Sequence, residues 1–84
     1  MNTKYTKYTK AQQVQQMYDD AQWDHISSDG CYSIAIAEAQ HLGGKEIYNA
    51  NDEQSSKSFA PTRTFEFDDS SIAQITYGGV YAVD

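Results

Sequence analysis

The chain has 84 residues, a hydrophobic fraction of 39% and one cysteine, which suits a single domain over residues 1–84 and excludes an intrachain disulfide. Twelve acidic residues oppose six basic ones, giving a net charge of −6, so the folded protein repels nucleic acid and anionic membranes and is attracted to basic surfaces. No segment approaches the roughly 20 apolar residues of a membrane span, and no apolar stretch follows the lysines of residues 1–10, so we expect a cytoplasmic protein without a signal peptide.

The first predicted element is a helix from about Lys10 to about His25, preceded by an extended or frayed lead-in at residues 1–8. Thr9 is a typical N-cap, and Gln12 three residues later completes a Thr-x-x-Gln capping box. Apolar residues recur at helical spacing along one stripe, at Val14, Met17, Tyr18 and Ala21. The remaining faces carry glutamine and aspartate, so the pattern predicts an amphipathic helix.

A second helix is predicted over Cys31–Leu42, after a break rich in serine and glycine. Ser28 and Asp29 are candidate caps at its start, and Gly43 fits the left-handed position after its end. The first half of the segment is apolar on almost every side, which predicts a helix buried beneath other elements. A buried strand is the competing interpretation, but the alanines favour a helix.

The last third of the chain predicts a three-stranded antiparallel meander. Its strands and first turn, in order, are Thr64–Phe67, the turn Asp68–Ser71, Ile72–Tyr77 and Val80–Val83. A Gly78-Gly79 turn opposes Tyr77 to Val80. That register places one apolar set on the core face: Ala73, Ile75, Tyr77, Val80 and Ala82.

Between the second helix and the meander, Lys45–Tyr48 is a candidate short strand and residues 49–58 have the polar, aperiodic character of a loop. The fold class we expect is α+β, with two N-terminal helices packed on a three-stranded antiparallel β-meander.

The cysteine and the two histidines are candidate catalytic or metal-binding residues. Cys31 would open the second helix, where a helix N-terminus lowers a thiol pKa, and His25 and His41 are candidate bases. A small buried hydrophobe is the favoured interpretation, because Cys31 begins the most apolar stretch. The spacing of these three residues matches no zinc pattern, and no Walker loop, dinucleotide fingerprint or calcium loop occurs. We therefore expect no enzyme, no cofactor and no metal.

Two groups of carboxylates stand where they add nothing evident to local stability. The first crowds the C-terminal half of the first helix, where the helix dipole disfavours anions and an i, i+4 pair repels. The second lies at a hairpin tip. The six residues are Asp19, Asp20, Asp24, Glu66, Asp68 and Asp69. We predict that they bind a partner; the alternative is a solvated helix face and an ordinary turn.

Trp23 lies beside the first of these groups in the sequence. Tryptophan and tyrosine ringed by charge are common at protein interfaces. The interpretation we favour is the other one, in which Trp23 closes the core at the end of the helix.

Residues 62–84 carry a strand, an Asp68-Asp69 turn with serine after it, a second strand, a turn and a third strand containing Tyr81. This segment resembles the meander of small acidic phage proteins, in particular the Thr-Phe-Asp-Asp-x-Ser segment of one type I-F anti-CRISPR family. The resemblance implies an inhibitor that imitates DNA with surface carboxylates and occupies the DNA path of a CRISPR surveillance complex. It carries over Asp68 and Asp69 alone as contact residues.

The function we expect is that of a phage or mobile-element inhibitor. Its acidic surface would bind the basic surface of a nucleic-acid-handling complex, a CRISPR effector foremost, without binding nucleic acid or membrane itself. A second hypothesis is a structural or regulatory module that dimerises through the exposed side of the sheet, with its charge serving only solubility. A third is a small enzyme that uses Cys31. The sequence leaves the oligomeric state open.

Overall fold

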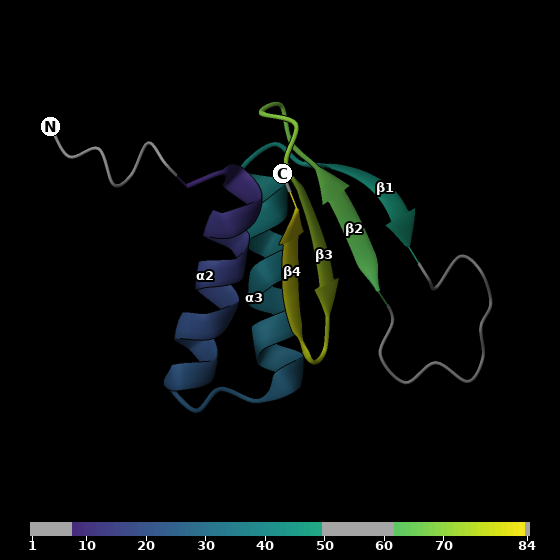
Figure 1. Cartoon of the computed structure of the whole chain (residues 1–84). Coiled ribbons are helices and arrows are strands. Elements are labelled where there is room, and N and C mark those ends of the chain that lie inside the picture. Colours follow the sequence, from purple (N-terminus) through teal and green to yellow (C-terminus); the bar gives the residue numbers. More distant parts are fainter. Residues whose placement is uncertain (1–7, 50–61, 84) are drawn as a thin grey trace, which may run out of the picture.

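The computed structural model describes residues 8–49 and 62–83. Two helices lie side by side on one face of a four-stranded antiparallel sheet whose strand order follows the chain (Figure 1). This arrangement is the expected α+β class. The elements are α2 (Lys10–Trp23), α3 (Ser28–His41), β1 (Lys45–Asn49), β2 (Arg63–Glu66), β3 (Ile72–Thr76) and β4 (Gly79–Val83). Of the predicted lead-in and loop, residues 1–7 and 50–58 lie outside the described part of the chain.

The sheet has four strands among the described residues, so the predicted three-stranded meander is incomplete. Strand β1 pairs antiparallel with β2, and Arg63 forms a two-pronged ion pair with Glu46 across this pair, at 2.7 and 2.8 Å. The register of β1 shifts between Glu46 and Tyr48. A bulge of this kind interrupts the alternation of side chains. The sequence pattern therefore indicates a short strand at this position but does not predict that the strand pairs with β2.

Helix α2 begins at the predicted residue. The Thr9 hydroxyl accepts a hydrogen bond from the Gln12 N–H at 3.1 Å, and the Gln12 side chain accepts one from the Thr9 N–H at 2.9 Å, so the capping box is confirmed. The buried face is formed by Ala11, Val14, Tyr18 and Ala21. Met17, which the sequence places on this stripe, is 37% exposed.

Helix α3 begins three residues earlier than predicted. Ser27 is its N-cap, and its hydroxyl accepts a hydrogen bond from the Gly30 N–H at 3.2 Å. Residues 28–30 have turn-forming character in sequence, yet they form the first helical turn, where the charge of Asp29 suits the helix dipole. Gly43 has a φ of +81°, as expected for the position after the helix.

The predicted all-round burial of α3 is only partly right. Its buried residues are Cys31, Ala35, Ile36 and Ala39. Ala37 is exposed, because α3 is covered by α2 at its side and by the sheet on its inner face, which leaves its outer face exposed (Figure 1).

The β3–β4 turn lies one residue earlier than predicted, which shifts the pairing of the two strands by two residues. Tyr77 and Gly78 form the turn, so Thr76 pairs with Gly79 and Ile75 pairs with Val80. The Thr76 hydroxyl stabilises it by donating to the Gly79 carbonyl at 2.9 Å and accepting from the Gly78 N–H at 3.1 Å. A shift of two residues leaves each strand side chain on its original face. The predicted core face is therefore retained apart from Tyr77, which lies in the turn.

The core lies between the sheet and the two helices. Phe65, Ile75, Val14 and Tyr18 are its largest fully buried side chains. The Tyr18 hydroxyl donates a hydrogen bond to the Tyr77 carbonyl, and burial raises the pKa of Tyr18 above its ordinary value. This bond closes the core at the end of the molecule where α2 finishes.

The opposite face of the sheet is not covered by either helix (Figure 1). Tyr48 and Tyr81 lie on it and are 44% and 58% exposed, with Val83 at 54%. At the β4 edge, the Gln15 side-chain amide donates to the Val80 carbonyl at 3.1 Å, so helix α2 satisfies part of that edge.

Candidate protein-binding surface

The structure divides the six predicted carboxylates between two ends of the molecule. Asp19, Asp20 and Asp24 lie at the end where α2 finishes, and the β2–β3 turn with Asp68 and Asp69 lies at the end where α2 begins (Figure 1). A 14-residue helix such as α2 is about 20 Å long. The two groups therefore do not form one continuous acidic surface.

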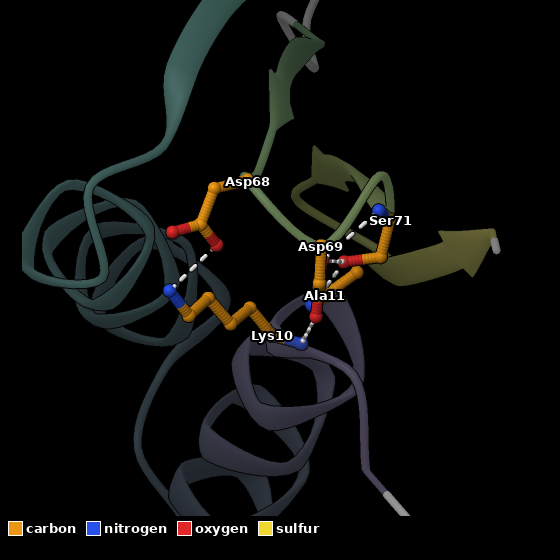
Figure 2. A network of polar contacts seen from close by, with 5 residues as sticks. All are labelled: Lys10, Ala11, Asp68, Asp69 and Ser71. Carbon is orange, nitrogen blue, oxygen red and sulfur yellow. Dashed lines mark hydrogen bonds and ion pairs between the residues drawn. The ribbon is translucent and has the colours of Figure 1, made fainter.

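Asp68 and Asp69 contact the first turn of α2 (Figure 2). The Asp68 carboxylate pairs with the Lys10 ammonium at 2.7 Å, and the Asp69 carboxylate accepts from the Lys10 backbone N–H at 2.9 Å. Asp69 also accepts from both the hydroxyl and the backbone N–H of Ser71. These contacts, the Ser71 hydroxyl first and the Lys10 N–H second, hold the pKa of Asp69 below its ordinary value.

The β2–β3 turn completes the hydrogen bonding at the start of α2. The first four N–H groups of a helix have no partner within it. Here the Thr9 and Gln12 N–H groups are satisfied by the capping box, the Lys10 N–H by Asp69, and the Ala11 N–H by the Ser71 hydroxyl at 3.1 Å. The expectation that local stability gains nothing from this carboxylate group is therefore wrong for Asp69.

Glu66 is exposed at the end of β2 and stands opposite Lys45 of β1 in the strand register. Opposite charges at directly paired positions favour the pairing of two strands. The register therefore gives Glu66 an opposite charge as its neighbour in the sheet, and it places Glu66 away from the carboxylates of α2.

The first group lies on the solvent face of α2. At 3.6 residues per turn, Asp19, Asp20 and Trp23 fall on the side of the helix opposite its buried face. Asp24 follows as the C-cap, and all four residues are exposed. The Gln16 side-chain amide donates to the Asp20 carboxylate at 3.0 Å. We call these four residues, Asp19, Asp20, Trp23 and Asp24, the Trp23 patch.

Trp23 does not close the core, so the favoured interpretation from sequence is wrong. Its side chain is 83% exposed, the largest exposure among the bulky hydrophobic residues described. The reason is helical geometry: Trp23 follows buried Ala21 by two residues, which is about 200° around the helix. The patch therefore combines the one tryptophan of the chain with three carboxylates.

The backbone after Trp23 is tightly closed. Helix α2 ends with hydrogen bonds from the His25 N–H to the Gln22 carbonyl at 3.0 Å and from the Ile26 N–H to the Ala21 carbonyl at 3.1 Å. His25 takes a left-handed conformation, with a φ of 67°. This double closure is the Schellman motif, and it places the patch on an ordered helix end.

Cys31, the nucleophile of the catalytic alternative, is buried in the core. Cys31 is 1% exposed, and its thiol donates to the Ile26 carbonyl at 3.4 Å. Within residues 8–49 and 62–83, no three His, Cys, Asp or Glu side chains are grouped to hold a metal ion. Neither described helix has the length and apolar character that crossing a membrane requires.

We compared the chain with protein-family models, with curated proteins and with solved structures, and none of the three comparisons found a match.

Proposed function

We propose that this chain is an inhibitor from a phage or mobile element that acts in the bacterial cytoplasm by occupying a basic, nucleic-acid-binding surface of a host complex. The observation that carries the proposal is the Trp23 patch, in which a tryptophan that is 83% exposed lies among three exposed aspartates. An anchor residue ringed by carboxylates is suited to a protein surface that is apolar at its centre and cationic at its rim.

The two kinds of residue contribute differently to binding. Burying a ring of about 200 Å² at about 25 cal/mol per Å² is worth roughly 5 kcal/mol before the costs of association. Exposed carboxylates contribute much less each, commonly below about 1 kcal/mol, because water and salt screen them. We therefore assign most of the affinity to Trp23 and the steering toward a basic partner to Asp19, Asp20 and Asp24.

The mechanism is competition with nucleic acid. Lysine and arginine side chains that hold phosphates also form charge-assisted hydrogen bonds with carboxylates. A partner whose cations are engaged by the patch would have fewer of them available for DNA, and high salt would weaken the complex.

The first partner to test is a type I-F CRISPR surveillance complex, because residues 62–84 resemble the anti-CRISPR segment. The contacts that hold Asp69 against α2 support assigning partner binding to the Trp23 patch in place of the β2–β3 turn. In the test, fluorescence anisotropy follows labelled target duplex bound to the purified complex as this protein is added. We expect DNA to be displaced at about 0.1 M salt and displacement to weaken at about 0.5 M.

Two matched pairs of variants locate the surface. Asp19→Asn with Asp20→Asn removes two patch charges, and Glu66→Gln with Asp68→Asn removes two charges elsewhere on the exposed surface. Trp23→Ala is matched by Tyr81→Ala, another exposed aromatic residue.

We expect each patch variant to raise the concentration needed for displacement by about tenfold or more, with each control within about twofold of wild type. Failure of the wild-type protein to displace DNA at low salt would exclude this complex as the partner. Equal losses from the two charge pairs would mean that net charge, and not the patch, is responsible.

The open face of the sheet favours a second function, a homodimerising interaction module. Tyr81 and Val83 are 58% and 54% exposed on that face. A dimer that persists in sedimentation velocity at high salt and becomes a monomer with Tyr81→Glu would support it, whereas a wild-type monomer across the same concentrations would exclude it.

A further inference from the structure

A groove of about 350 Å³ opens beside the Trp23 patch, on the side of α2 that faces α3. It is lined by Tyr8, Gln13, Gln16, Met17 and Glu38. Met17 and Tyr8 make it largely apolar, and they are 37% and 49% exposed. Both helices contribute to the lining, because the glutamines and Met17 belong to α2 and Glu38 belongs to α3.

Among the described residues, the groove carries negative charge without a matching cation. Glu38 is the charged residue among those that line it. Within residues 8–49 and 62–83, no hydrogen bond or ion pair engages the Glu38 carboxylate. Lys10, the described cation on α2, pairs instead with Asp68.

The groove and the patch are contiguous. Gln16 lines the groove and donates a hydrogen bond to the Asp20 carboxylate of the patch, at 3.0 Å. A segment of a partner that lies over the patch can therefore extend a side chain into the groove.

We propose that the groove receives an arginine side chain from the partner that the Trp23 patch binds, an inference that rests on the proposed function. An arginine has an apolar stem and a planar cationic head. The stem matches Met17, the guanidinium matches the Glu38 carboxylate and the amide oxygen of Gln13, and the Tyr8 ring adds a face for a cation–π contact. An apolar side chain would leave Glu38 uncompensated, and an anion would be repelled by it.

The recognition of arginine is tested without any partner protein. The probe is N-acetyl-arginine N-methylamide, and the matched control is the citrulline analogue, which keeps the shape and removes the charge. Carbon-edited NMR follows the Met17 methyl group of the full chain during titration. We expect saturable shifts with a dissociation constant on the order of 1 mM for the arginine probe and at least about tenfold weaker binding for the citrulline analogue. Equal binding of the two probes would overturn the proposal.

Two variants test which carboxylate is responsible for binding arginine. Glu38→Gln should reduce arginine binding to the level of the citrulline analogue. Asp29→Asn, which removes an exposed carboxylate of α3 outside the groove, should leave it within about twofold. Loss of arginine binding in both variants would mean that the charge of the whole chain, and not the groove, attracts the probe.

The DNA-displacement assay separates this proposal from the proposed function. We expect Glu38→Gln to weaken displacement by about fivefold. If Glu38→Gln displaces DNA as well as wild type while Asp19→Asn with Asp20→Asn does not, the groove proposal is overturned and the function stands. If arginine binds in a Glu38-dependent manner but the wild-type protein displaces no DNA, the groove is an arginine site and the proposed function is overturned.

Discussion

At the scale of single residues, His25 holds a backbone conformation that glycine adopts more easily. The two helices end in the same way, with left-handed φ values of 67° at His25 and 81° at Gly43. The hydrogen bonds of Gly43 and Gly44 to the Gln40 and Ala39 carbonyls repeat those that follow Trp23. A side chain in this conformation costs about 1 kcal/mol relative to glycine. The end of α2 is therefore less stable than it would be with glycine at position 25.

We expect His25→Gly to raise the free energy of unfolding by about 0.5 to 1 kcal/mol, because it removes the strain of the left-handed side chain. Gly43→Ala should lower it by about 1 kcal/mol for the same reason. Urea denaturation of both variants measures the two changes in the free energy of unfolding. A destabilised His25→Gly protein would show that the imidazole makes contacts whose loss outweighs the strain.

The contribution of Asp69 to the stability of the fold depends on pH. Its pKa is lower in the folded protein than the ordinary value of 3.8, so its contribution to stability is complete above that value and is lost as the pH falls through the lower folded pKa. We expect Asp69→Asn to reduce stability by about 1 kcal/mol at neutral pH, by analogy with helix-cap substitutions, and by less in acid.

Denaturant titrations of wild type and Asp69→Asn at neutral and acidic pH measure that difference. Asp68→Asn is the control, because the Asp68 side chain is 79% exposed in its ion pair with Lys10 and such pairs contribute little. A stability loss from Asp69→Asn that stays constant into acid would contradict a role for the charged carboxylate.

At the scale of elements, the junction between α3 and β1 depends on a close approach at Gly44. A Cβ there would lie 2.7 Å from a Phe67 ring carbon and 2.9 Å from the Ala39 carbonyl oxygen. Phe67 is 4% exposed and the Ala39 carbonyl belongs to the helix backbone, so neither atom can yield without moving the core.

We expect Gly44→Ala to destabilise the protein by about 2 kcal/mol or more, because the added methyl group overpacks the core. Gly78→Ala is the control, since its Cβ would meet only the Thr76 hydroxyl oxygen at 3.8 Å. Thermal unfolding of the two variants provides the comparison. Similar melting temperatures for both would contradict the tight packing at Gly44.

Local signals in the sequence predict the elements better than the contacts between them. The capping box at Thr9 and the glycine after α3 depend on neighbours in the chain, and both are confirmed. The addition of β1 to the sheet and the docking of Asp69 on α2 depend on pairs far apart in sequence, 59 residues for Asp69 and Lys10. No local pattern encodes such pairs.

The candidate site follows the same division. The helical stripe through Val14, Tyr18 and Ala21 is readable from the sequence, and its period already places Trp23 on the other side of the helix, away from the core. The groove was not predictable, because the nearness of Met17 and Glu38 depends on how two helices pack.

At the scale of the whole molecule, the two carboxylate groups singled out from the sequence lie at opposite ends of α2. The carboxylates at the start of α2 are used in the fold, through Lys10 and Ser71. Those at its end surround an exposed tryptophan. We therefore propose that the end where α2 finishes is the binding surface, and that Trp23 defines it together with the charge.

The most direct test replaces Trp23, the only tryptophan, with 5-fluorotryptophan and follows its ¹⁹F resonance as the unlabelled surveillance complex is added. We expect the resonance to shift and broaden at low salt and to recover when duplex DNA or high salt is added. A resonance that stays unchanged while the protein displaces DNA from the complex would contradict the claim, because binding would then occur through another surface.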